Sequence, residues 1–92
     1  MLSKTHYRNI KAVIADTQDA TANTIANIVG EDIEVICLLG NLWVNPFGAT
    51  AVADTTAIKL IAGQSVSFCN GKGLSMISDA TGSDYQIIVM GF

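Results

Sequence analysis

The side chains that could do chemistry in this 92-residue chain are few and widely spaced. His6 is the only histidine, and it lies in a polar N-terminal segment, which is a poor place for the rigid base that a Ser or Cys nucleophile needs. Cys37 and Cys69 each lie in an apolar or strand-like run. Two thiols and one histidine do not supply the ligands of a tetrahedral zinc site. We expect two buried or half-buried free thiols, with a disulfide between them as the alternative.

The acidic residues and the glycine-rich segment match no reactive pattern either. The acidic cluster at 31–34 has too few oxygen ligands at alternating positions for a calcium loop. Asp79 and Asp84 are expected in a hairpin loop, where acidic residues are common. Residues 70–73 read NGKG, which lacks the spacing and the following helix of a phosphate-binding loop. We therefore predict no catalytic, cofactor-binding or metal-binding residues and no enzymatic activity.

The composition limits the partners that this chain can have. Half of its residues are hydrophobic, 14% are charged and the mean hydropathy is +0.42, whereas about 25% of a typical soluble domain is charged. A small domain needs much polar surface, so this shortage indicates that another chain covers some apolar surface. Five basic residues against eight acidic ones argue against nucleic-acid binding. The most apolar stretch, 35–44, is much shorter than the ~20 residues of a membrane span, so we predict no membrane partner.

The elements that would position any site are short strands. Runs of Ile, Val and Thr separated by Gly, Asn and Asp clusters are typical of an all-β chain. We predict a single small antiparallel β-sandwich or jelly-roll-like barrel of seven to eight short strands at residues 11–92, after an N-terminal arm at residues 1–10. The expected strands are 11–15, 24–29, 33–38, 42–45, 58–61, 65–69, 74–78 and 85–90.

The sequence also predicts two hairpin turns and leaves the structure of one segment open. A two-residue turn at 40–41 and a loop at 79–84 are expected to join strands as hairpins. Residues 16–27 are open between a helix capped by Asp16 and a loop followed by a strand. The second is favoured, because Thr and Asn residues disfavour a helix interior. These residues are Thr21, Asn23, Thr24 and Asn27.

Several expected strands are apolar on both faces. Val35 and Cys37 would share one face, yet Ile36 on the other face is also apolar. This pattern fits either bulges and irregular strands or an outer sheet face that is buried between subunits, and we favour the second. The predicted subunit interface consists of the apolar residues on these second faces: Ile36, Leu38, Trp43, Ile77, Ile88 and Met90.

The C-terminal two-thirds of the chain carries motifs that resemble a known group of proteins. The motifs are LWVNPFGATA at 42–51, IKLIAGQSVSF at 58–68 and GLSMISDATGSDYQIIVMGF at 73–92. They resemble the strand-end and hairpin motifs of small β-sandwich structural proteins of tailed bacteriophages, which are capsid decoration (cement) or tail-associated proteins. These are turn and packing motifs, so the resemblance implies an architecture and a genetic context rather than a reaction.

The resemblance implies a non-enzymatic virion structural protein. The favoured role is a capsid decoration or cement protein that is made in the host cytoplasm and stabilises the phage head. Such a chain would assemble as a homo-oligomer, with a trimer favoured over a dimer, and would bind the major capsid protein or other virion proteins. The predicted arm carries most of the basic groups of the chain and is expected to contact an acidic capsid surface. These groups are Lys4, His6, Arg8 and Lys11.

Two alternatives remain at this point. The first is a tail, neck or fibre-base structural component, which the same resemblance allows. The second belongs to another class and is a small carbohydrate-binding module of a tail or fibre protein. That module would need Trp43 and Tyr85 to be exposed and coplanar, so that they could stack on a sugar, whereas packing in a core or interface is the favoured role of these aromatic residues.

Overall fold

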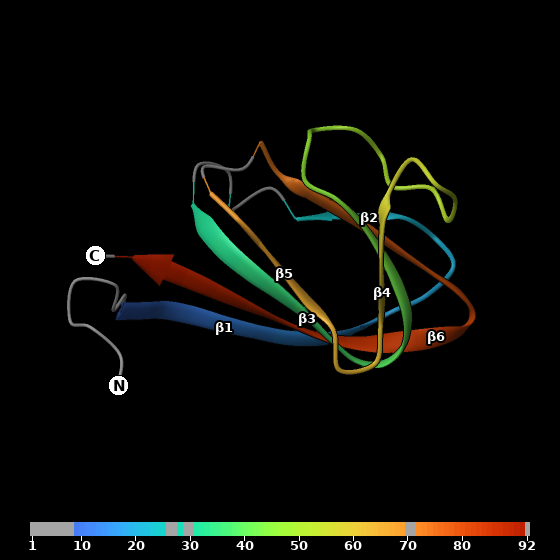
Figure 1. The fold of residues 1–92 in the computed structure, drawn as a ribbon, viewed down its shortest axis with the longest axis horizontal. Helices are drawn as coiled ribbons and strands as arrows, with labels where there is room; N and C mark the ends of the chain where they lie inside the picture. The colour runs from blue at the N-terminus through green and yellow to red at the C-terminus, as the bar shows by residue number, and fades with distance from the viewer. Residues whose placement is uncertain (1–8, 26–27, 29–30, 70–71, 92) are drawn as a thin grey trace.

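The chain folds as a bent antiparallel β-sheet (Figure 1). The structure is a computed structural model, and it describes residues 9–25, 28, 31–69 and 72–91. The strands are β1 (Asn9–Gln18), β2 (Asn23–Ile25), β3 (Asp32–Asn45), β4 (Ile58–Ile61), β5 (Ser65–Phe68) and β6 (Leu74–Gly91). No helix occurs within the described ranges, and the prediction of an all-β antiparallel fold is confirmed.

β3 and β6 form the centre of the sheet and pair with each other along their whole length. β1 and then β2 pair with the other edge of β6, while β5 and β4 pair with the other edge of β3. The sheet therefore has two halves, with the strand order β1-β6-β3-β5 in the first half and β2-β6-β3-β4 in the second. These halves contain the short strand segments that the sequence predicts, but four of the segments are joined into β3 and β6.

The predicted hairpins at 40–41 and 79–84 are therefore wrong. In a hairpin, the segments before and after the turn pair with each other, whereas here both segments belong to one strand, β3 or β6, and each pairs with the other strand. Both strands turn and change register there. Gly40 pairs with Ser83, but Leu42 pairs with Ser78, so β6 has several extra residues opposite a single residue of β3. Extra residues of this kind form a β-bulge, which bends and twists a strand instead of ending it. We call this place, where the two halves of the sheet meet, the bend.

Two glycines make the bend possible. Gly40 has φ +80° and Gly82 has φ +78°, in the left-handed region that favours glycine. A Cβ on Gly40 would overlap the carbonyl oxygen of Gly82, so the two strands also need the absence of a side chain here. Turn chemistry is present nearby, since Asp79 accepts hydrogen bonds from the N–H and the hydroxyl of Thr81. The sequence signals thus mark a real backbone feature, but it is a bulge and not a hairpin turn between two paired strands.

The segment that was open between helix and strand is a strand, a short connection and a second strand. β1 continues to Gln18, and β2 begins at Asn23. The buried amide of Gln18 donates hydrogen bonds to the carbonyl oxygens of Asp19 and Thr21, at 3.3 and 2.8 Å. The carbonyl of Asp19 also accepts the N–H of Ser78 at 2.8 Å, which ties this connection to β6. The described residues of this segment contain no helix.

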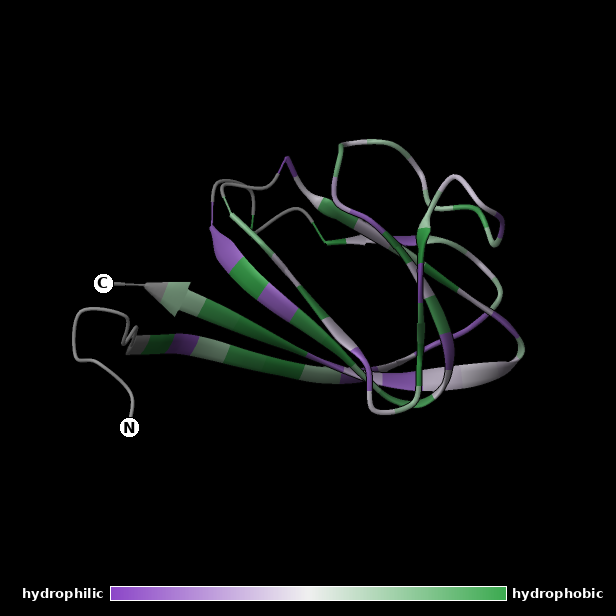
Figure 2. Ribbon diagram, in the orientation of Figure 1, coloured by the Kyte–Doolittle hydropathy of each residue, from purple (hydrophilic) through white to green (hydrophobic). Residues whose placement is uncertain are grey.

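One hydrophobic core receives side chains from both halves of the sheet. Buried side chains alternate with partly exposed ones along most of β3 and β6. In Figure 2 hydrophilic and hydrophobic residues also alternate at the start of β3. This alternation places every second residue of a strand on the same face. The core residues are Ile28, Ile33, Val35, Cys37, Leu42, Val44, Leu60, Leu74, Met76, Tyr85, Ile87 and Val89.

Candidate functional site

The two thiols lie in different environments, and His6 lies outside the described residues. Cys37 and Cys69 are both free; Cys37 is buried in the core, while Cys69 follows β5 and is exposed. The expectation that both thiols are at least half-buried is therefore wrong for Cys69, because that residue lies beyond the last pairing of an edge strand. Burial raises the pKa of the Cys37 thiol, which keeps it neutral and unreactive. Within the described ranges, no three His, Cys, Asp or Glu side chains are placed to hold a metal ion.

The first half of the sheet brings together three of the six predicted interface residues. Ile88 lies opposite Val13 of β1, and Met90 lies opposite Ile10. The third, Ile36, is on β3, and its partner on β6 is Gln86, two residues from Ile88 on the same face. All three are half-buried in the single chain. We call the set Ile10, Val13, Ile36, Ile88 and Met90 the outer patch.

Ile10 and Val13 were missed at the level of the sequence, although they are the most exposed members of the outer patch. They are 62% and 52% exposed. The prediction assigned Ile10 to the arm, and it did not place the first strand next to the last one. A bulge in β1 between Ile10 and Ala12 puts Ile10 and Val13 on the same face, which strict alternation would not do.

The other three predicted interface residues lie away from the outer patch. Trp43 and Ile77 face each other across β3 and β6 in the second half of the sheet. The Nζ atom of Lys59 lies 5.3 Å from the ring centroid of Trp43, in cation–π contact. Leu38 lies in the bulge of β3 and is 51% exposed. The six residues are therefore divided by the bend and do not form one surface.

Trp43 and Tyr85 do not form the platform that a carbohydrate-binding module would need. Tyr85 is only 2% exposed and belongs to the core. Burial also raises the pKa of its phenol, and the nearby Asp16 adds to this shift. Trp43 is half-buried, and Phe47 is exposed in the loop after β3. The condition set for sugar stacking, that Trp43 and Tyr85 are both exposed, is not met.

The basic residues of the predicted arm can be followed only in part. Lys4, His6 and Arg8 lie outside the described residues. β1 begins at Asn9, so Lys11 is part of a strand. The Nζ atom of Lys11 forms an ion pair with Glu31 at 2.7 Å, on the surface of the domain.

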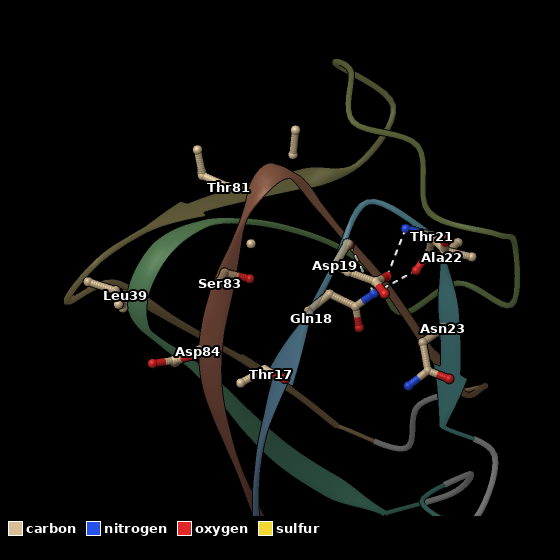
Figure 3. A pocket seen from close by; sticks show the side chains of 12 residues that line it. Thr17, Gln18, Asp19, Thr21, Ala22, Asn23, Leu39, Thr81, Ser83 and Asp84 are labelled. Carbon is tan, nitrogen blue, oxygen red and sulfur yellow. Dashed lines mark hydrogen bonds between the residues drawn. The ribbon is translucent and has the colours of Figure 1, made fainter.

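A polar pocket of about 640 Å³ lies beside the bend, and the sequence analysis did not predict it. It is lined by the segments 17–23 and 80–84 together with Leu39 (Figure 3). These segments are 60 residues apart in the chain, and only the pairing of β1 with β6 brings them together. The lining includes the carboxylates of Asp19 and Asp84 and contains no basic side chain.

Several polar groups of this pocket have no partner. Ser83 is only 4% exposed, and its hydroxyl oxygen makes no hydrogen bond. The carboxylate of Asp84 makes none with any described residue, whereas Asp19 accepts the N–H of Thr21 at 2.9 Å. A buried hydroxyl without a partner costs free energy, so this arrangement favours an occupant that brings hydrogen-bonding groups.

Comparisons with known proteins identify a fold and no family. No family model matches the chain, and no curated protein matches its sequence. Similar solved structures include the following two. A cupin-2 domain-containing protein from Shewanella frigidimarina has a TM-score of 0.55 and 15% identity, over 95% of this chain and 82% of the other. A Bacillus structure described as endospore appendages that form disulfide-linked pili has a TM-score of 0.51 and 18% identity, over 98% and 94%.

At this level of identity the two similarities establish the fold alone. They support the assignment of a small β-sandwich or barrel of the jelly-roll kind, which the strand pairing also indicates. Separately, the described part of the chain has no helix that is long and apolar enough to cross a bilayer.

Proposed function

We propose that this chain is a non-enzymatic structural subunit that assembles with copies of itself through the outer patch. The favoured setting is the outer shell of a tailed bacteriophage, where the subunit would act as a capsid decoration protein. The setting rests on the resemblance of the three C-terminal motifs. The self-assembly rests on the exposed apolar side chains of β1 and the half-buried ones of β6 beside them.

The observation that carries the proposal is the position of the outer patch next to a free sheet edge. Within the described residues, β1 pairs only with β6, so its other edge has unpaired backbone groups. Exposed edge strands with apolar side chains promote pairing with another chain, and natural monomers usually protect them. Ile10 and Val13 project from this edge strand, and they continue onto Ile88 and Met90 of β6.

The surroundings of the outer patch limit how a second copy can bind. On the β3 side the same face becomes polar, because Ile88 lies opposite Glu34, and Glu34 accepts a hydrogen bond from Ser65. The contact is therefore expected to centre on β1 and β6. A stable interface covers about 800 Å² per partner, roughly a seventh of the 5572 Å² that the chain exposes.

The Bacillus pilus structure supports the structural class of this proposal. Its description names disulfide-linked pili, and its similarity spans 98% of this chain. A fold of this kind therefore occurs in a protein that is described as forming pili. The likeness does not distinguish a fibre from a shell, and we favour the shell because of the phage-like motifs.

Light scattering of the purified protein tests the self-assembly. We expect a mass that is a multiple of 9.7 kDa, with three copies favoured. Ile88→Asp should give a 9.7 kDa species, whereas the control Ile61→Asp, which alters an exposed isoleucine of β4 in the other half of the sheet, should keep the oligomer. A wild-type protein that is monomeric at all concentrations would refute the proposal.

The virion setting needs its own experiment. A tagged copy of the chain should sediment with phage heads that are purified from cells producing both, and Ile88→Asp should reduce the bound amount. Recovery of the wild-type protein only in the soluble fraction, with intact heads present, would contradict the decoration role while leaving self-assembly to be judged by the first test.

A further inference from the structure

The polar pocket beside the bend has the charge and the free groups of a binding site for a basic, extended peptide. Its two carboxylates lie on either side of β6, with Asp19 next to Gln18 and Asp84 next to Leu39, as Figure 3 shows. Because no basic side chain lines it, the pocket repels anions such as phosphate and favours a cationic partner.

The second observation is the buried hydroxyl of Ser83. Only 4% of Ser83 is exposed, and its hydroxyl oxygen has no hydrogen-bond partner. In Figure 3 the oxygen points from β6 toward Gln18, which is its partner residue across the strand pair. An extended peptide supplies backbone N–H and C=O groups at regular intervals, which could satisfy this hydroxyl while the side chains reach the carboxylates.

The chain itself contains a segment of matching chemistry. Lys4, His6 and Arg8 occur at every second position, so they would lie on one side of an extended segment and span about 13 Å. Residues 1–8 contain two of the five Lys and Arg residues and none of the eight acidic residues. The charge of this segment is therefore opposite to that of the rest of the chain.

The geometry of β1 indicates that the segment would come from another copy. Residues 1–8 join β1 at Asn9, whereas the pocket lies at the other end of β1, near Gln18. The two ends of a ten-residue strand are about 30 Å apart. Even when fully extended, Lys4 lies at most ~18 Å from Asn9, so it cannot reach the pocket of its own chain.

We infer that residues 1–8 of one subunit bind across the polar pocket of a neighbouring subunit, with their basic side chains paired with Asp19 and Asp84. This inference rests on the proposed self-assembly and specifies its geometry. Each subunit then uses two different surfaces, the arm and the pocket, so the contact is head-to-tail. A head-to-tail contact forms a ring, such as the favoured trimer, when the rotation between subunits closes, and a filament when it does not.

A pair of charge-reversed proteins tests whether the contact runs between subunits. The first variant is Lys4→Glu with Arg8→Glu, and the second is Asp19→Lys with Asp84→Lys. The dissociation constant of each, measured by light scattering over a dilution series, should rise at least ~10-fold, because repulsion replaces attraction at two sites. In an equimolar mixture, every contact between unlike variants joins opposite charges, and a mixed three-membered ring has two such contacts out of three. The dissociation constant of the mixture should therefore fall below that of either variant alone but stay above the wild-type value. Asp54→Lys, which reverses an exposed acid in a loop outside the pocket, is the matched control and should keep the wild-type constant.

The outcomes separate this inference from the proposed function. If both charge variants assemble as the wild type does while Ile88→Asp dissociates, the outer patch assembles the protein and the arm inference is wrong. If the arm variant keeps the oligomer but loses binding to phage heads, the arm contacts the capsid, and the inference is again wrong. If the wild type is a monomer at every concentration, both the inference and the proposed self-assembly fail.

The pocket variant needs a check of its folding by circular dichroism. If it does not fold, the arm variant alone tests the inference, because its substitutions lie before β1.

Discussion

Ile87 and Ile88 are neighbours in β6, with the same side chain, yet they belong to two different surfaces of the molecule. Ile87 is 0% exposed and lies in the core opposite Val35. Ile88 faces outward opposite Val13 and is half-buried in the single chain. The inner face of the sheet is therefore buried by the fold itself, whereas the outer face stays partly exposed in the single chain.

This difference explains why a small chain has such a hydrophobic composition. The inner faces of both halves of the sheet form one core, which uses a dozen buried side chains. Further large apolar residues are exposed, among them Ile10 at 62% and Leu39 at 61%. The excess hydrophobicity thus lies on the surface, where it can drive assembly but does not stabilise the single chain.

The largest expected difference between the two faces is in stability, when Ile87 and Ile88 are each replaced by alanine. Ile87→Ala should lower the free energy of unfolding by about 4 kcal/mol, because it removes buried methyl groups and leaves a cavity. Ile88→Ala should cost less than about 1 kcal/mol in the dissociated chain and should instead weaken the oligomer. Urea unfolding at low protein concentration measures both values, and equal losses would show that the two faces do not differ.

The reaction rates of the two cysteines give a second comparison between a buried and an exposed position. Cys69 is exposed and should react with a thiol reagent at the rate of a free peptide thiol. Cys37 should react at least ~100-fold more slowly, because it is buried and needs a local opening of the sheet, and because its raised pKa reduces the thiolate. Mass spectrometry during labelling gives both rates, with Cys69→Ser as the control that leaves a single slow site.

The bend allows a similar comparison between two glycines of positive φ. Gly40→Ala should destabilise the fold by about 2 to 3 kcal/mol, because the new Cβ meets the Gly82 carbonyl in addition to the backbone strain. Gly63 has φ +89° and no atom close enough to meet a Cβ, so Gly63→Ala should cost only about 1 kcal/mol. Thermal unfolding measures the loss of stability in each variant. Equal falls in the unfolding temperature would contradict the close approach of β3 and β6.

The smallest expected effect is a pH-dependent change in stability at Asp79, beside the bend. Hydrogen bonds from Thr81 and then from Asn41 lower the pKa of Asp79 in the folded chain. A lowered folded pKa means that the ionised carboxylate stabilises the fold above its unfolded pKa and that this contribution is lost as the pH falls through the folded pKa. The gap in unfolding free energy between the wild type and Asp79→Asn should therefore narrow from about pH 5 to pH 2. A gap that does not change over this range would count against the hydrogen bonds.

The sequence predicted the strand segments and their faces more accurately than their connections. Ile33 and Val35 were placed on one face and Ile36 on the other, and burial confirms this, because the period of two is a local property of any strand. The turns at 40–41 and 79–84 were read from Gly, Asn and Asp residues. Those residues do adopt special backbone conformations, but a bulge and a hairpin need similar local chemistry, and long-range pairing decides between them.

The candidate sites divide in the same way. Ile36, Ile88 and Met90 could be found from alternation alone, whereas Ile10 and Val13 required the knowledge that the first strand pairs with the last. The polar pocket had no signal in the sequence, because Gln18 and Ser83 become neighbours only through that same pairing.

The amino-acid sequence by itself therefore determined the all-β class, the inward and outward sides of each strand and the excess of apolar residues on the outward sides. These properties depend on residue type and on a repeat of two, which a short stretch of chain contains in full. Only the tertiary structure decided that four strand segments merge into β3 and β6, that the six predicted interface residues separate at the bend, and that a polar pocket forms beside it. Each of these depends on which strands pair and in what register, and those contacts join residues that are far apart in the chain.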